Sequence, residues 1–100
     1  MHDIIKLPYG GNFSLTRLIE KIQSTGGTLI IGARNCRLDL HPYQESLDYW
    51  LRTNGATSPD TRQTNAELLQ TLTSRGNLEK VKIKSPYTGH ACYALRFRKN

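Results

Sequence analysis

Apolar residues recur at helical spacing in three stretches of the chain. The first stretch follows Ser14, which can cap a helix, and stops at the Gly26-Gly27 pair, which is typical of a helix end. Its apolar stripe consists of Leu15, Leu18, Ile19 and Ile22. Because these positions lie on one face at 3.6 residues per turn, the pattern predicts an amphipathic helix.

The second helical stretch is expected to open at Pro42, since proline suits the first position of a helix. It is expected to end at Asn54-Gly55. The apolar face consists of Tyr43, Leu47, Trp50 and Leu51. The spacing of Trp50 with its apolar neighbours indicates a core position.

Two helix starts compete in the third stretch. Ser58-Pro59-Asp60 can begin one turn of helix, and Thr64-x-x-Glu67 is a capping box that can begin a longer one. The longer helix would have Leu68, Leu69 and Leu72 as its apolar stripe and Gly76 as its stop. A single helix from Pro59 to Arg75 is the alternative.

Strand patterns fill the remaining segments. "HDIIKL" predicts a short strand closed by Pro8 and the Gly10-Gly11 pair. "TLIIGARNCRLDL" predicts a hairpin with strands at Thr28–Ile31 and around Leu38 and Leu40.

The last quarter, "EKVKIKSPYTGHACYALRFRKN", predicts a basic β-hairpin. One strand alternates lysines with Val81 and Ile83, and the return strand alternates apolar residues with arginines. If both dry faces coincide, Val81 should pair with Leu95 and Ile83 with Tyr93. That register requires a five-residue loop or a bulge, with Gly89 at positive φ. It would gather five cations on one side: Lys80, Lys82, Lys84, Arg96 and Arg98.

The element order is therefore β-α-β-β-α-(α)-α-β-β, which is that of a small α+β domain. One hundred residues with 37% hydrophobic content suit a single domain over 1–100. The expected core consists of Leu18, Ile22, Ile30, Leu38, Leu47, Trp50, Leu51, Leu69, Leu72, Val81 and Leu95.

Charge narrows the range of partners. Fourteen Lys and Arg against eight Asp and Glu give a net charge of +6, which favours nucleic acid or an acidic protein surface. No leader and no apolar run long enough for a membrane span is visible, so a cytoplasmic protein without membrane contact is expected.

From Pro42 onward the chain resembles a winged helix-turn-helix domain. "ESLDYWLRTNG" is similar to a first helix, "NAELLQTLTSRGNLEKV" to a recognition helix, and "KIKSPYTGHACYALRF" to a wing hairpin. The resemblance implies DNA binding by 42–100, with 1–41 as an N-terminal helix and hairpin. The segment between Gly55 and Gly76 is shorter than the corresponding segment in that family.

The layout of "LTRLIEKIQSTGGTLIIGARNCRLDL" is similar to that of small α-β-β-α docking domains, which bind peptides.

Patterns for catalysis and metal binding are missing from the sequence. Cys36, His41, His90 and Cys92 lack zinc-ligand spacing, and the two cysteines are too few for a disulfide framework. "SPDTRQ" and "LEKVK" resemble nuclease elements, but Val81 stands where the catalytic lysine is required. We therefore expect no enzyme activity, no metal and no cofactor.

Two functions of different class remain. The first is a non-enzymatic nucleic-acid-binding protein of the kind represented by small regulators of phages and mobile elements, with DNA slightly favoured over RNA. The five hairpin cations would contact phosphates, and Tyr87 and His90 would reach a groove or an unpaired base. The residues that would read base edges are Arg62, Gln63, Asn65 and Gln70.

The second function is that of a phage-type adaptor or inhibitor that docks its basic surface or edge strand on an acidic protein. Lysines on an edge strand also serve simply to prevent aggregation.

Overall fold

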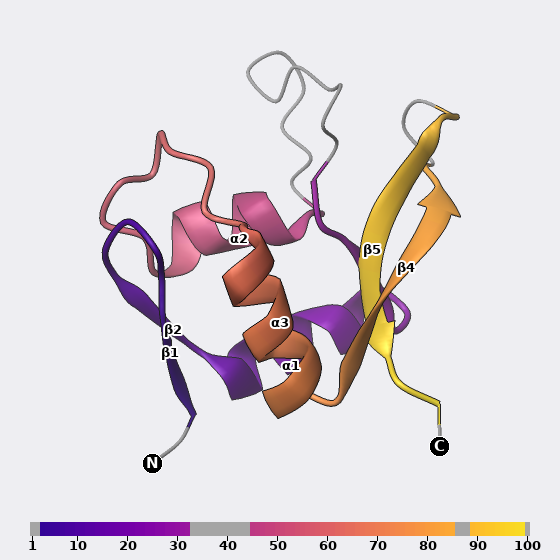
Figure 1. The fold of residues 1–100 in the computed structure, drawn as a ribbon, viewed down its shortest axis with the longest axis horizontal. Helices are drawn as coiled ribbons and strands as arrows, with labels where there is room; N and C mark the ends of the chain where they lie inside the picture. The colour runs from indigo at the N-terminus through magenta and orange to yellow at the C-terminus, as the bar shows by residue number, and fades with distance from the viewer. Residues whose placement is uncertain (1–2, 33–44, 86–88, 100) are drawn as a thin grey trace.

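Three helices lie between two antiparallel sheets in the computed structural model, which describes residues 3–32, 45–85 and 89–99 (Figure 1). In chain order the elements are β1 (Ile4–Lys6), β2 (Asn12–Ser14), α1 (Leu15–Ser24), β3 (Thr28–Ile30), α2 (Leu47–Asn54), α3 (Ala66–Arg75), β4 (Leu78–Lys84) and β5 (Ala91–Phe97). The predicted α+β class is confirmed. The strand expected around Leu38 and Leu40 lies outside the described residues.

The two sheets stand on opposite sides of the helices. β1 and β2 form a two-stranded hairpin, and β3, β5 and β4 form a three-stranded sheet in that order. Figure 1 shows the hairpin at the left, the sheet at the right, and the tip of β4 and β5 extending past α3. β5, which follows all the other described elements in sequence, is thus the central strand.

The core between the sheets contains most of the residues expected there. Those that are buried as expected are Leu18, Ile22, Ile30, Leu47, Trp50, Leu51, Leu72 and Leu95. Leu69 and Val81 are only partly buried, and Leu38 lies outside the described residues. Trp50 is 9% exposed, and its ring meets Phe13 edge to face at 5.8 Å between centroids. Most of the described residues in the three helix stripes are therefore buried as predicted, with Ile19 and Leu69 only partly so.

α1 begins and ends where its sequence predicts. Ser14 Oγ accepts a hydrogen bond from the N–H of Arg17, which caps the first turn. At the other end, the N–H of Gly27 donates to Ile22 O at 2.9 Å and that of Gly26 to Gln23 O at 3.2 Å. Both glycines have positive φ, so the end is a Schellman motif.

α2 starts later than Pro42. Ser46 is extended at φ −132° and ψ 155°, and its hydroxyl accepts from the N–H of Tyr49, so the helix begins at Leu47. The expected start was wrong because a proline at a suitable position does not by itself cap a helix. Pro42 and Tyr43 lie outside the described residues.

α3 corrects both readings of the third stretch. Ser58 O accepts from the N–H of Thr61 at 3.1 Å, so the expected one-turn helix is a β-turn. Residues 55–65 contain no helix, which excludes a single helix from Pro59 to Arg75. The cap is Asn65 rather than Thr64, because Asn65 Oδ1 accepts from the N–H of Leu68 at 2.7 Å. Gly76 ends α3 as expected.

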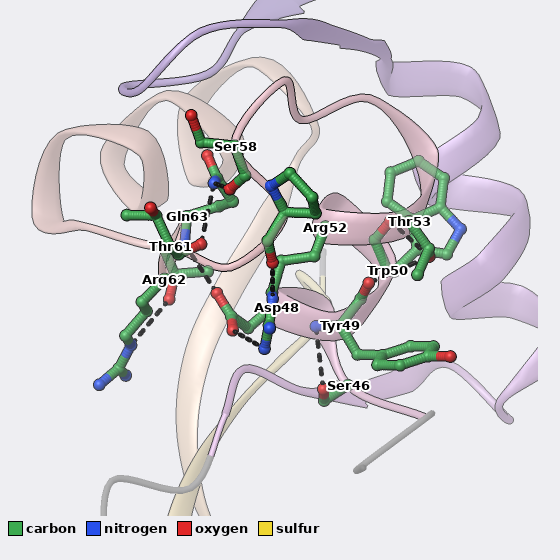
Figure 2. A network of polar contacts seen from close by, with 12 residues as sticks. Ser46, Asp48, Tyr49, Trp50, Arg52, Thr53, Ser58, Thr61, Arg62 and Gln63 are labelled. Carbon is green, nitrogen blue, oxygen red and sulfur yellow. Dashed lines mark hydrogen bonds and ion pairs between the residues drawn. The ribbon is translucent and has the colours of Figure 1, made fainter. Parts of the chain in front are cut away.

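A buried carboxylate fixes the loop between α2 and α3. Asp48 Oδ1 accepts from the backbone N–H of Gln63 at 2.8 Å, and Gln63 Nε2 donates to the carbonyls of Ser58 and Thr61 at 2.8 and 2.9 Å. Arg52 Nη1 lies 3.9 Å from Asp48 Oδ2. Figure 2 shows Asp48 between Arg52 and the loop. This network orders a segment that has neither helix nor strand.

The β1–β2 hairpin includes a strand that the sequence patterns did not predict. Ile5 pairs with Phe13, and both side chains are buried. Gly11 at φ +99° lies so close to the C-terminal cap of α2 that an added Cβ would lie 2.0 Å from Gly55 O. β2 was missed because three residues directly before a helix give no measurable alternation.

Candidate functional site

The register of β4 and β5 differs from the expected one. Val81 pairs with Ala94 and Ile83 with Cys92. The N–H of Ser85 donates to His90 O at 2.8 Å, so four residues connect the strands without the expected fifth residue or bulge. The predicted pairs of Val81 with Leu95 and Ile83 with Tyr93 are therefore wrong. Gly89 has positive φ, at +77°, as predicted.

The prediction failed because β5 is buried on both faces. It assumed that each strand has one dry and one wet face, which holds for a strand covered on one side only. Ala94 and Leu95 are adjacent in the chain and both 0% exposed. Ala94 shares its face with Val81 and Ile30, whereas Leu95 points into the core beside Leu29.

This register places the lysines of β4 and the odd-numbered residues of β5 on the same face of the sheet. Near the core that face carries Leu78, Leu95 and Phe97. Beyond the core it is exposed and becomes what we call the lysine face, which consists of Lys80, Lys82, Lys84, Ala91 and Tyr93. Successive lysines along the strand are about 6.7 Å apart, since a strand rises about 3.3 to 3.4 Å per residue.

Tyr93 occupies the middle of the lysine face. Its register partner is Lys82, and Lys80 Nζ lies over its ring at 4.4 Å from the centroid. Tyr93 is nevertheless 48% exposed. The predicted pairing of Tyr93 with Ile83 would have placed this ring on the dry side of the hairpin. The observed pairing of Ser85 with His90 turns the ring toward the lysines instead.

The lysines have no acidic partner among the described residues. The ion pairs among the described residues join Lys21 with Glu45, Arg52 with Asp48, and Arg96 with Glu79. Glu79, the acid nearest to the lysines in sequence, lies on the opposite face of the sheet at 2.5 Å from Arg96 Nε. The positive charge of the lysine face is therefore not neutralised locally.

The two arginines do not belong to this face, contrary to expectation. Arg96 pairs across the strands with Glu79. Arg98 Nη2 donates to Leu78 O at 3.2 Å and to Thr73 O at 3.4 Å, near the carboxyl end of α3. The register reverses the parity of β5 relative to β4, and for that reason the five cations do not lie together.

The residues expected to read base edges are also dispersed. Gln63 is 0% exposed and Asn65 caps α3, so Gln63 in particular is not available to a ligand. Arg62 and Gln70 are exposed, and Arg62 Nε donates to Thr64 Oγ1 at 3.3 Å. His90 is exposed near the hairpin tip. Tyr87 lies outside the described residues.

β4 also presents an open edge. The N–H of Ser85 points to β5, and backbone direction alternates along a strand, so the N–H and C=O groups of Lys80, Lys82 and Lys84 point away from β5. Within the described part of the chain, no strand pairs with that edge. The side chains of these three lysines therefore lie on the exposed face, and their backbone N–H and C=O groups lie at the free edge.

The described residues contain neither a metal site nor a membrane-spanning helix. No group of three His, Cys, Asp or Glu side chains in residues 3–32, 45–85 and 89–99 is placed to hold a metal ion. No helix in these ranges has the length and apolar character to cross a bilayer. Comparisons of the chain with family models, curated proteins and solved structures found no match.

Proposed function

We propose that this chain is a non-enzymatic nucleic-acid-binding protein that contacts phosphates through its lysine face. The observation that supports this proposal is the row of three exposed lysines without an acidic partner in the described part of the chain. Each ammonium can approach one phosphate and release its condensed counterions, which is the main source of affinity in non-specific binding. DNA serves as the first ligand to test.

The arrangement has a cost that a ligand would remove. Like charges on neighbouring positions of a sheet destabilise it by a few tenths of a kcal/mol each. Protection of an edge strand against aggregation also explains lysines on β4. The two explanations differ in one respect, since protection requires no affinity for nucleic acid.

The test compares two variants that lose the same charge at different places. The double change Lys82→Gln and Lys84→Gln acts on the lysine face, whereas Lys6→Gln and Arg17→Gln removes two exposed cations from β1 and α1. Binding of a labelled random-sequence duplex is measured at several salt concentrations. We expect the first variant to reduce the log–log salt slope by about two and the second to change it little.

Two results would contradict the proposal. One is a parent protein with no affinity for duplex or single-stranded nucleic acid. The other is an equal loss in both double variants, which would show that affinity follows net charge and not the lysine face.

A second candidate function is binding of an acidic protein partner, and the free edge of β4 favours it. An extended peptide can add to such an edge through backbone hydrogen bonds, and acidic side chains at alternate positions would meet the lysines. Binding of the parent to an alternating Glu-Val peptide, in the absence of nucleic-acid affinity, would support this function instead.

A further inference from the structure

We infer that the lysine face binds single-stranded nucleic acid, with Tyr93 as the ring on which an unpaired base stacks. This inference rests on the proposed function and specifies its ligand. It follows from the observed register, which places a half-exposed aromatic ring among cations instead of on a dry face.

The geometry combines the two elements that single-strand binding needs. Lys82 lies directly across from Tyr93, and Lys80 and Lys84 lie at the two diagonal positions. Three positive charges on β4 are therefore next to the Tyr93 ring. Proteins that bind single strands use such a pairing, in which basic groups follow the backbone and aromatic rings stack on bases. Ala91, the next residue on the same face of β5, is small and exposed and leaves space beside the ring.

Lys80 links the free and the bound state. In the free protein its Nζ lies 4.4 Å from the centre of the Tyr93 ring. A cation–π contact at an exposed site is weaker than base–aromatic stacking, so a base can replace the ammonium on the ring. The displaced ammonium carries its charge on a flexible stem and can then pair with the phosphate next to that base.

A duplex does not satisfy the same arrangement. Its bases are stacked on their neighbours, and only their edges are accessible in the grooves. Tyr93 belongs to a strand and lies on the face of the sheet, so it cannot enter a base stack as a protruding loop residue can. A duplex would therefore use the lysines alone and leave the ring unused.

The experiment compares one strand with one duplex. The full chain is titrated against a labelled oligothymidine of about 16 nucleotides, the upper end of the site sizes known for single-strand binding folds, and against a duplex with the same number of phosphates. We expect tighter binding to the strand. Tyr93→Leu, which removes the ring but suits a strand, should weaken strand binding about tenfold and leave duplex binding and both salt slopes unchanged.

Two further variants separate stacking from fold. Tyr93→Phe retains the ring and should restore strand binding to within about twofold of the parent, since stacking uses the ring and not the hydroxyl. Tyr9→Leu is the matched control, because Tyr9 is 56% exposed but lies in the turn between β1 and β2. It should bind both ligands like the parent. Circular dichroism of each variant establishes that the fold is intact.

The possible failures can be told apart. Equal affinity of the parent for strand and duplex, with Tyr93→Leu unchanged on both, would overturn this inference and leave the proposed function in place. An equal loss on both ligands in Tyr93→Leu would also overturn it, because Tyr93 would then act through the fold. A parent protein that binds neither the strand nor the duplex would overturn both this inference and the proposed function.

Discussion

Asp48 Oδ1 accepts a hydrogen bond from the backbone N–H of Gln63 at 2.8 Å, and both residues are buried. Replacing Asp48 by Ala leaves that N–H without a partner in the interior, so the variant should lose about 1 to 3 kcal/mol of unfolding free energy. Urea denaturation measures the loss. Asp60→Ala, which changes an exposed acid in the same loop, is the control and should stay within about 0.5 kcal/mol of the parent. Equal stability of the two variants would contradict a structural role for the buried carboxylate.

Trp50 should be the most costly single truncation in α2. Its side chain is 9% exposed and its ring packs edge to face on Phe13. Trp50→Ala is expected to lose about 3 to 5 kcal/mol, which is a large part of the stability of a small domain. Trp50→Phe keeps an aromatic ring and should lose less. A loss below about 1 kcal/mol in the alanine variant would show that the helix does not pack against the β1–β2 hairpin as described.

Two glycines distinguish steric crowding from backbone strain. Gly11 and Gly26 both have positive φ, but an added Cβ at Gly11 would lie 2.0 Å from Gly55 O, whereas nothing lies within 4 Å at Gly26. Gly26→Ala should lose about 1 to 2 kcal/mol, from conformation alone. Gly11→Ala should lose clearly more, because the backbone at Gly55, which caps α2, must also move. Thermal unfolding of both variants tests the contact, and equal losses would argue against it.

Asp3 should make the stability of the fold depend on pH in the acidic range. Hydrogen bonds from the side chains of Ser14 and Thr16, and from the N–H of Thr16, lower the pKa of Asp3 below 3.8. A depressed pKa in the folded state means that the stabilisation is present above about pH 4 and is lost as the pH falls through the folded value. Asp3→Asn should therefore melt at a lower temperature than the parent near pH 7. The difference between the two proteins should shrink as the pH is lowered below about 4, and a difference that does not change with pH would refute this assignment.

Arg96 and Lys82 should behave differently although both are hairpin cations. Arg96 is paired with Glu79 on the face away from the lysines. Arg96→Gln should change unfolding free energy by at most about 1 kcal/mol, as is usual for a partly exposed ion pair, and should leave the salt slope of nucleic-acid binding almost unchanged. Lys82→Gln should reduce that slope by about one. A larger effect of the arginine would place the binding surface on the other face.

Local signals in the sequence were sufficient for most helix positions and insufficient for strand pairing. Ser14 and the Gly26-Gly27 pair define α1 because capping depends on residues a few positions apart. The start of α3 moved by one residue since both Thr64 and Asn65 can cap, and only the fold selects Asn65.

The candidate site was predicted in part. The lysines of β4 were correctly placed together on one face, because alternation within a strand is a local property. The partner face was wrong, since β5 is buried on both faces, at Ala94 and at Leu95, and this burial depends on parts of the fold that lie far away in sequence, such as β3. Tyr93 was consequently assigned to the dry side. No pattern around Gln63 indicates that Asp48 would bury it.

The central position of β5 constrains the order in which the molecule can assemble. Thr28 pairs with Arg96, so the larger sheet forms only after nearly the whole described chain is available. A nascent chain leaves the ribosome amino end first, and until β5 emerges both β3 and β4 are without their sheet partner. Because β5 closes the longest loop in the fold, we expect its docking to limit the folding rate. The α1 segment and the β1–β2 hairpin, whose contacts are local, can form earlier.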